Sequence, residues 1–242
     1  MPKLNVTPLI SGFLLTLTGL VVALWISWLG LAQMDFGYQY AYKILDINGH
    51  IERYAPQNRY KKGFALTHQS EHERLFAEIA EAVQNRGENL AKIEYELPSK
   101  NSITLLTEAE VIHLQDVANL ITFFNQVAAV CLILFLGVLV LFFYLKLPPP
   151  GWFQPLITLA LVAAIACAAI LIFGAEKSFY WLHTKIFPDD HQWFFYYQES
   201  LMTTLMKAPD LFGFIAAIWS IVAVLIYIAL QVAIRTALKK RT

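Results

Sequence analysis

Histidines inside a run of aromatic residues are the clearest candidates for chemistry in this sequence. The run FYWLHTKIFPDDHQWFFYY extends from Phe179 to Tyr197, and nine of its nineteen residues are aromatic. Trp and Tyr gather at membrane interfaces because their rings are amphipathic, so the aromatic residues alone predict an interfacial segment. That explanation does not account for His183 and His191. A histidine changes its charge near neutral pH, so it is suited to proton transfer.

A further histidine, His113, lies three residues before Asp116 in a segment that is predicted to be helical. Residues three apart share a helix face, so the carboxylate is expected to orient His113 and raise its basicity. If His113 and His183 meet at a lipid surface, the pair would suit acid–base chemistry on a lipid ester or amine. No nucleophile elbow or phosphate-binding loop in the sequence competes for this role. His191 follows Pro188 in a loop and is expected to matter little.

Two other features have simpler explanations. His68 and His72 are four apart, which would suit a metal on a helix, but the capping box at residues 70–73 would start that helix after His68. No third ligand is evident nearby, so a solvated surface is predicted, and neither a metal nor another cofactor is expected. The basic cluster that includes Arg59 and Lys62 would either hold lipid phosphates or form a solvated turn.

Composition places these residues in a membrane protein. The chain has 242 residues, is 57% hydrophobic and only 15% charged, which is typical of polytopic membrane proteins. Four uncharged stretches are long enough to cross a bilayer, which takes about 20 helical residues. They are Leu9–Ala32, Val117–Leu145, Leu147–Ala175 and Leu211–Ile234. The first is interpreted as a retained anchor, because it is longer than the signal-peptide core of about 7–15 residues.

The distribution of charge predicts the orientation in the membrane. Basic residues beside spans are retained in the cytoplasm. With the N-terminus inside, all eighteen Asp and Glu fall outside, and six basic residues flank the spans on the cytoplasmic side. The six are Lys3, Lys146, Arg235, Lys239, Lys240 and Arg241. The prediction is a cytoplasmic-membrane protein with both ends inside and with His113 and His183 at one external surface.

The predicted architecture is mainly α, a four-span helical bundle with a small extracytoplasmic α+β cap. Its parts are span 1 at 1–32, the cap and the start of the second helix at 33–116, span 2 at 117–145, a short cytoplasmic link with span 3 at 146–175, an aromatic interfacial segment at 176–210, and span 4 with a basic tail at 211–242.

Within the cap, periodicity predicts one helix and two short strands. The helix begins at Ser70 and ends near Gly87. Its apolar face consists of Leu75, Phe76, Ile79 and Val83. Alternation of apolar and polar residues predicts strands at Lys92–Leu97 and Ser102–Leu106, joined by a turn at Pro98–Asn101.

Two stretches on either side of this region carry further signals. Tyr38–Ile51 is aromatic and β-branched, and its Asn48-Gly49 pair is a turn signal typical of hairpins. Thr107-x-x-Glu110 is a second capping box, and the helix that it opens meets no breaker before Pro148. A single helix at 108–145 is therefore predicted to begin outside and continue into the second span.

Two segments resemble the signatures of one bacterial membrane-protein family. The stretch 107–117, TEAEVIHLQDV, is similar to the family's HLxDV segment at the start of the second span. The stretch 179–212 is similar to its second signature, a His four residues before Phe-Pro, then a Trp, a Leu-x-x-Leu helix and a Pro. Here these are His183, Phe187-Pro188, Trp193, Leu201, Leu205 and Pro209. With its four-span layout, the chain resembles the lipoprotein intramolecular transacylases over essentially its whole length.

The resemblance implies an acyltransferase that acts on diacylglyceryl-modified N-terminal cysteines of lipoproteins. The sn-2 acyl chain would move from the glycerol to the cysteine α-amino group and leave a lyso-form lipoprotein. It implies that His113 and His183 are the catalytic pair, assisted by Asp116, without deciding which histidine is the base. The residues expected to contact substrate or lipid are Arg59, Lys62, Tyr180, Trp181, Phe187 and Trp193. Family members often carry Arg where this chain has Ala118, so any substrate contact by that arginine would be missing or supplied elsewhere, by Arg59 or Lys177.

The implied partners are diacylglyceryl lipoproteins and membrane lipids, without nucleic acid, metal or nucleotide, because the ester already stores the acyl group. Two other functions remain open from the residues. One is a phospholipid or lyso-lipid acyl hydrolase that uses the same histidine pair. The other is a non-enzymatic membrane assembly or lipid-binding factor, in which the histidines are interface residues. Nothing in the sequence indicates an oligomeric state.

Overall fold

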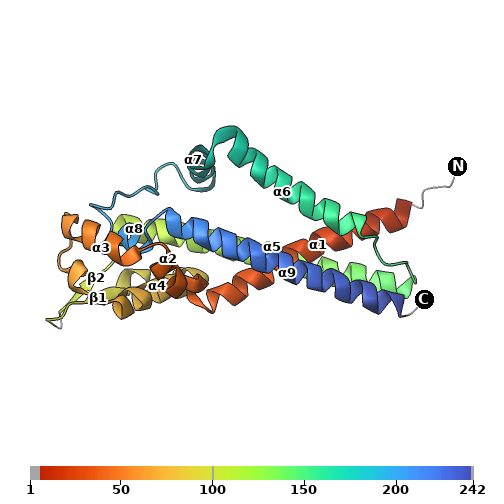
Figure 1. The fold of residues 1–242 in the computed structure, drawn as a ribbon, viewed down its shortest axis with the longest axis horizontal. Coiled ribbons are helices and arrows are strands. Elements are labelled where there is room, and N and C mark those ends of the chain that lie inside the picture. Colours follow the sequence, from red (N-terminus) through yellow and green to blue (C-terminus); the bar gives the residue numbers. More distant parts are fainter. Residues whose placement is uncertain (1–5, 100, 241–242) are drawn as a thin grey trace. The chain divides into compact units, whose positions relative to one another are not determined.

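The computed structural model describes residues 6–99 and 101–240 (Figure 1). Lys3 and Arg241, which entered the predicted orientation, and Lys100, within the predicted turn Pro98–Asn101, lie outside the described residues. The long helices are α1 (Val6–Ala32), α5 (Glu108–Tyr144), α6 (Phe153–Phe173) and α9 (Asp210–Lys239). The shorter helices are α2 (Tyr38–Ile44), α3 (Ile47–Tyr54), α4 (Gln69–Gln84), α7 (Ala175–Ile186) and α8 (Leu201–Met206). Single 3-10 turns occur at η1 (Asp35–Gly37), η2 (Ala55–Gln57), η3 (Phe64–Leu66) and η4 (Leu90–Lys92), and the strands are β1 (Glu94–Glu96) and β2 (Ser102–Thr104).

The chain divides into two compact units, which are described separately. The apolar unit consists of Met1–Leu29, Phe124–Leu182 and Trp219–Thr242. The histidine unit consists of Gly30–Phe123 and His183–Ile218.

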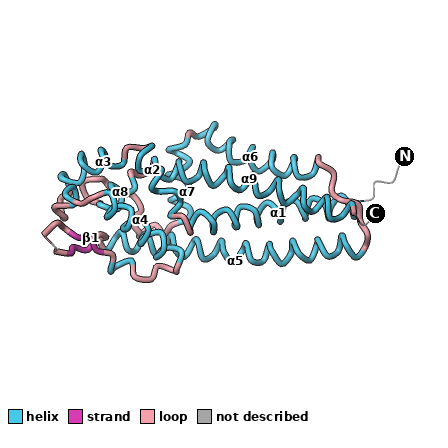
Figure 2. Tube along the Cα trace, turned by 60° about the horizontal axis from the view of Figure 1, so that its bottom comes forward, coloured by secondary structure: helices cyan, strands magenta, loops and turns pink. Residues whose placement is uncertain are grey.

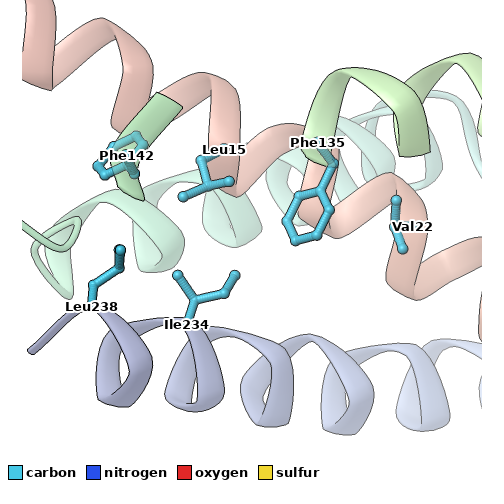
Figure 3. Packing of buried hydrophobic residues seen from close by; sticks show 6 residues of the cluster. All are labelled: Leu15, Val22, Phe135, Phe142, Ile234 and Leu238. Carbon is cyan, nitrogen blue, oxygen red and sulfur yellow. The ribbon is translucent and has the colours of Figure 1, made fainter. Parts of the chain in front are cut away.

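Side chains from α1, α5 and α9 form the core of the apolar unit (Figure 3). This core consists of Leu15, Val22, Phe135, Phe142, Ile234 and Leu238. Polar side chains also join helix α1 to α5 and to α6. Trp25 Nε1 donates to Asn125 Oδ1 at 2.9 Å, and Thr16 and Thr158 share a hydrogen bond between their hydroxyl oxygens at 3.0 Å. Such interhelical hydrogen bonds are typical of membrane bundles, where the surrounding lipid supplies no partners.

Three helices are long and apolar enough to cross a membrane, by length and composition: Leu9–Ala32, Glu108–Tyr144 and Asp210–Lys239. They coincide with the predicted first, second and fourth spans. The predicted third span coincides with α6, of which Phe153–Ile165 is recognised as a shorter apolar helix. The protein is therefore mainly helical, and three of its helices are long and apolar enough to cross a membrane.

The helix and hairpin predicted within the histidine unit are confirmed, with one correction. The predicted apolar face of α4 is buried. The α4 end is closed by Gly87, whose N–H donates to the carbonyl oxygen of Ala82 at 2.8 Å. Its start differs, because His68 is the N-cap and no side chain caps the helix. The expected capping box at Ser70 is therefore wrong. Strands β1 and β2 pair antiparallel, with Tyr95 opposite Ile103, and appear in magenta in Figure 2.

The hairpin-like stretch Tyr38–Ile51 is helical, contrary to the prediction. Tyr38, Ala41 and Tyr42 are buried at helical spacing. The turn between α2 and α3 is made by Asp46, which adopts a left-handed conformation and accepts the N–H of Gly49 at 3.2 Å through Oδ1. An aspartate cap at this position outweighs the Asn-Gly signal, so Asn48 and Gly49 lie in the first turn of α3.

The capping box at Thr107 is confirmed. The Thr107 N–H donates to Glu110 Oε2 at 2.5 Å, and the Glu110 N–H donates to Thr107 Oγ1 at 3.4 Å. Helix α5 then continues without interruption to Tyr144, as expected. The start of this helix carries the first of the candidate histidines.

Candidate active site

The structure brings His113 and His183 together within the histidine unit. Their ring centroids are 6.5 Å apart, and the ring planes are inclined by 32°. His113 lies in the second turn of α5, and His183 lies in the last turn of α7. Two segments that are far apart in the sequence therefore contribute one imidazole each to the same site.

Three aromatic rings surround the histidine pair. Phe187 contacts both, with ring centroids 5.0 Å from His113 and 5.2 Å from His183. Trp193 lies 4.8 Å from His183, and Phe195 lies 6.0 Å from His113. Apolar rings beside an imidazole exclude water and so disfavour its charged form.

His113 is held neutral by these surroundings. It precedes the uncharged run that starts at Val117, so it lies before the span itself. Burial and, to a smaller extent, the neighbouring His183 lower the pKa of His113 to about 4, against an opposing effect of Asp116. Its Nδ1 atom is buried and has no hydrogen-bond partner among the described residues. A buried polar atom without a partner is costly, so this nitrogen is suited to receive a hydrogen bond from an entering substrate.

Asp116 binds a histidine that sequence reasoning had set aside. Its Oδ2 atom lies 2.6 Å from Nδ1 of His191. The expected orientation of His113 by this carboxylate is thus corrected, because Asp116 acts on His113 through charge and on His191 through a hydrogen bond. The hydrogen bond to Asp116, with a contribution from Asp190, raises the pKa of His191. No local signal relates Asp116 to His191, since the pair depends on how the loop after α7 packs.

A second carboxylate, Glu110, fastens the same loop on the other side of His113. Glu110 is fully buried, and its Oε1 atom accepts a hydrogen bond from the Ser200 hydroxyl at 2.5 Å. The same hydroxyl oxygen accepts the Thr203 N–H at 2.8 Å and thereby caps α8. Glu110 and Asp116 stand three residues before and three residues after His113. The segment from His191 to Ser200 is therefore held to α5 at both ends.

The predicted basic lipid contacts already have partners within the histidine unit. Arg59 Nη1 forms an ion pair with Glu199 Oε1 at 2.9 Å, and the Arg59 N–H donates to the carbonyl oxygen of Gln198 at 2.8 Å. Lys62 Nζ donates to the carbonyl oxygen of Asn58. Arg59 thus supports the loop at 198–199. Binding of lipid phosphates by Arg59 and Lys62 stays a prediction.

The four predicted aromatic contacts are divided between the units. Phe187 and Trp193 surround the histidines, as described above. Tyr180 and Trp181 precede them on α7, belong to the apolar unit, and are both exposed. Exposed Tyr and Trp side chains are consistent with a membrane interface, and their contact with substrate stays a prediction.

His72 is a core histidine and not a surface residue, which corrects the prediction. Its side chain is 1% exposed. Nδ1 lies 2.7 Å from the Tyr42 hydroxyl, and Nε2 lies 2.7 Å from the Thr67 hydroxyl. Both ring nitrogens are thus engaged within the protein, while His68 is exposed at the helix N-cap. Among the residues that the structure describes, no group of three or more His, Cys, Asp or Glu is arranged to hold a metal ion.

Comparison with known proteins gives two matches. Residues 13–209 match the family model described as lipoprotein intramolecular transacylase Lit. The fold is similar to a solved structure of the membrane integral lipoprotein intramolecular transacylase Lit from Bacillus cereus, in a variant with one histidine replaced by arginine. The TM-score is 0.65 at 15% identity, and the alignment covers 98% of this chain and 92% of the other. At that identity the likeness shows a common fold. A search of curated proteins finds no match.

Proposed function

Because this chain belongs to the lipoprotein intramolecular transacylase family, we propose that His113 and His183 together catalyse its acyl transfer. The family match confirms the resemblance drawn from residues 107–117 and 179–212. The chain is accordingly an integral membrane acyltransferase with lipoprotein intramolecular transacylase activity. The histidine pair, its mechanism and the membrane topology are our proposals.

The proposed reaction moves one acyl group and one proton within a diacylglyceryl lipoprotein. The free α-amine of the modified cysteine attacks the carbonyl carbon of the sn-2 ester, so a carbon–nitrogen bond forms. His113 takes a proton from the attacking nitrogen, and His183 donates a hydrogen bond to the carbonyl oxygen. The tetrahedral intermediate then breaks its bond to the glycerol oxygen, and His113 returns the proton to that oxygen. No atom is lost, and both histidines end in their starting state.

One observation carries this assignment: the buried Nδ1 atom of His113 has no hydrogen-bond partner among the described residues, and His183 lies beside it. A base must be unprotonated to accept a proton, and a pKa of about 4 keeps His113 in that form at neutral pH. The same low pKa makes the protonated form a strong acid, which favours return of the proton to the glycerol oxygen. The assignment of His183 rests on its position alone.

Product analysis distinguishes the proposed transfer from hydrolysis. Intramolecular transfer conserves the mass of the lipidated N-terminal peptide but converts its free amine into an amide. We therefore expect mass spectrometry of a diacylglyceryl lipoprotein incubated with the purified protein to show an unchanged peptide mass and loss of reactivity toward amine reagents. Fragmentation should place one acyl chain on nitrogen.

The other functions give different products. A hydrolase would lower the peptide mass by one acyl group and release free fatty acid, and that result would contradict the transfer mechanism. A non-enzymatic factor would leave the substrate as it was. The control is the same incubation with the His183→Ala protein, which should leave the amine free.

We also propose the four-span arrangement, with α6 as the third span and residues 33–116 and 176–210 outside the cytoplasm. The support is the charge pattern together with the length of α6, whose 21 residues suffice to cross a bilayer. Both histidines then face the external leaflet, where the lipid anchor of an exported lipoprotein lies.

The topology has a direct test. Reporter fusions after Lys146 and after Thr242 are expected to be active in the cytoplasm, and fusions near Gly87 and Asp190 outside it. Each pair serves as the control for the other. An external Lys146 would overturn this topology and would separate His113 from His183 across the membrane.

A further inference from the structure

We infer that His191 is a positioning residue, whose ion pair with Asp116 fastens the loop after α7 to α5 beside the histidine pair. The inference rests on the proposed catalytic role of His113 and His183. It adds a third histidine to the site, one that acts on the reaction through the residues that it holds in place.

The geometry of the loop supports this role. Between its two attachments to α5, at His191 and Ser200, the loop carries Trp193 and Phe195. Trp193 packs against His183, and Phe195 packs against His113. Release of either attachment would therefore move two of the rings that exclude water from the histidine pair.

The two attachments differ in how they respond to pH. The Glu110–Ser200 attachment is buried, and its donor is a hydroxyl that does not titrate in this range. The Asp116–His191 attachment is partly exposed, with side-chain exposures of 15% and 34%, and its donor is an imidazole. The charged groups that act on His191 are Asp116 from α5 and Asp190 from its own segment, and both are acidic.

The sign of the pH dependence follows from the raised pKa of His191. A raised pKa means that the folded state favours the charged imidazole, so the stabilisation is fully present below the ordinary value near 6.5. It is lost as the pH rises through the raised pKa. The loop is therefore held most firmly in mildly acidic solution, and its hold weakens in alkaline solution.

Hydrogen exchange of the purified full-length protein in detergent tests the attachment without reference to catalysis. The measurement follows peptides that cover residues 188–196 at pH 6.0 and pH 8.5, comparing variants only at equal pH. At pH 6.0 we expect faster exchange in His191→Ala and in Asp116→Asn than in the wild type. His191→Arg, which keeps a cation that does not titrate, should remain protected at both pH values. His68→Ala, an exposed histidine elsewhere, is the matched control.

Conversion of diacylglyceryl lipoprotein by the same proteins tests the effect on the reaction. At pH 6.0 His191→Ala should convert about tenfold more slowly than the wild type, the effect expected from loss of one charge-assisted hydrogen bond. The ratio between the two proteins should shrink at pH 8.5. His191→Arg should recover most of the rate, and the His191→Ala and Asp116→Asn double variant should be no slower than either single variant.

Each outcome decides something. Wild-type protection of residues 188–196 in His191→Ala at pH 6.0 would overturn the attachment. Faster exchange with conversion within about twofold of the wild type would overturn the positioning role, because an exposed ion pair often contributes little. If the catalytic assignment is wrong, His113→Ala or His183→Ala will convert the substrate at a normal rate. That result would not change the conclusion from hydrogen exchange.

Discussion

Replacement of His113 or His183 by alanine is expected to slow conversion of diacylglyceryl lipoprotein to the lyso form by about 10²–10⁴-fold, the usual contribution of general acid–base catalysis. The protein should still insert at its normal level. His113 supplies the nitrogen that would receive the proton, for which the described part of the chain offers no hydrogen-bond partner. His183, on a different helix, has its ring centroid 6.5 Å from that of His113. The measurement is the conversion rate in membranes, with protein abundance determined in parallel.

The double variant gives additional information. If the two imidazoles act on one proton and one carbonyl group, removal of both should be little worse than removal of either, because partners in one catalytic unit are strongly non-additive. His68→Ala is the control and should convert at the wild-type rate. Near-normal conversion by His183→Ala would refute the mechanism, even if the fold is correct.

Replacement of Glu110 by alanine is expected to lower the free energy of unfolding by about 2–4 kcal/mol, because one buried and one partly buried donor lose their acceptor. Glu110 is fully buried and accepts hydrogen bonds from the Thr107 N–H and the Ser200 hydroxyl. The same change should slow conversion, since the loop that carries Trp193 would lose its attachment next to Ser200. Thermal unfolding in detergent and the conversion rate measure the two effects.

Two variants sharpen this test. Glu110→Gln retains one acceptor oxygen and the capping-box pattern, so its loss of stability should be smaller than that of Glu110→Ala. Glu108→Ala removes a neighbouring glutamate that is exposed, and it should change stability by about 0.5 kcal/mol or less. Equal stability of the Glu108 and Glu110 alanine variants would show that the buried contacts contribute nothing.

Features set by nearby residues were predictable from the sequence. The Thr107–Glu110 capping box predicted the start of α5 because its two hydrogen bonds join residues three apart. Charge-free runs predicted the apolar helices, since length and composition alone decide whether a helix can cross a bilayer. The proximity of His113 and His183 was also predictable in outline, because the expected topology brings both to one surface.

Features set by tertiary packing were not predictable. His72 has the composition of a surface helix around it, yet Tyr42 and Thr67 from other segments engage both of its ring nitrogens. Asp116 was matched with the histidine on its own helix, whereas the folded loop presents His191 to it at 2.6 Å. Pairing between residues far apart in the chain leaves no periodic signal, and a single sequence offers no other.

The unbroken course of α5 has a consequence for the lipid surroundings of the enzyme. Its 37 residues span about 55 Å, whereas the hydrocarbon layer is about 30 Å thick. His113 precedes the first residue of the charge-free run, Val117, by four residues, which is about 6 Å along the helix axis. In the proposed topology, this helix would place the imidazole of His113 just above the acyl chains, near the level at which glycerol esters lie. The rate of acyl transfer would then depend on bilayer thickness, because a thicker or thinner bilayer would tilt the helix or displace His113 from the level of the ester.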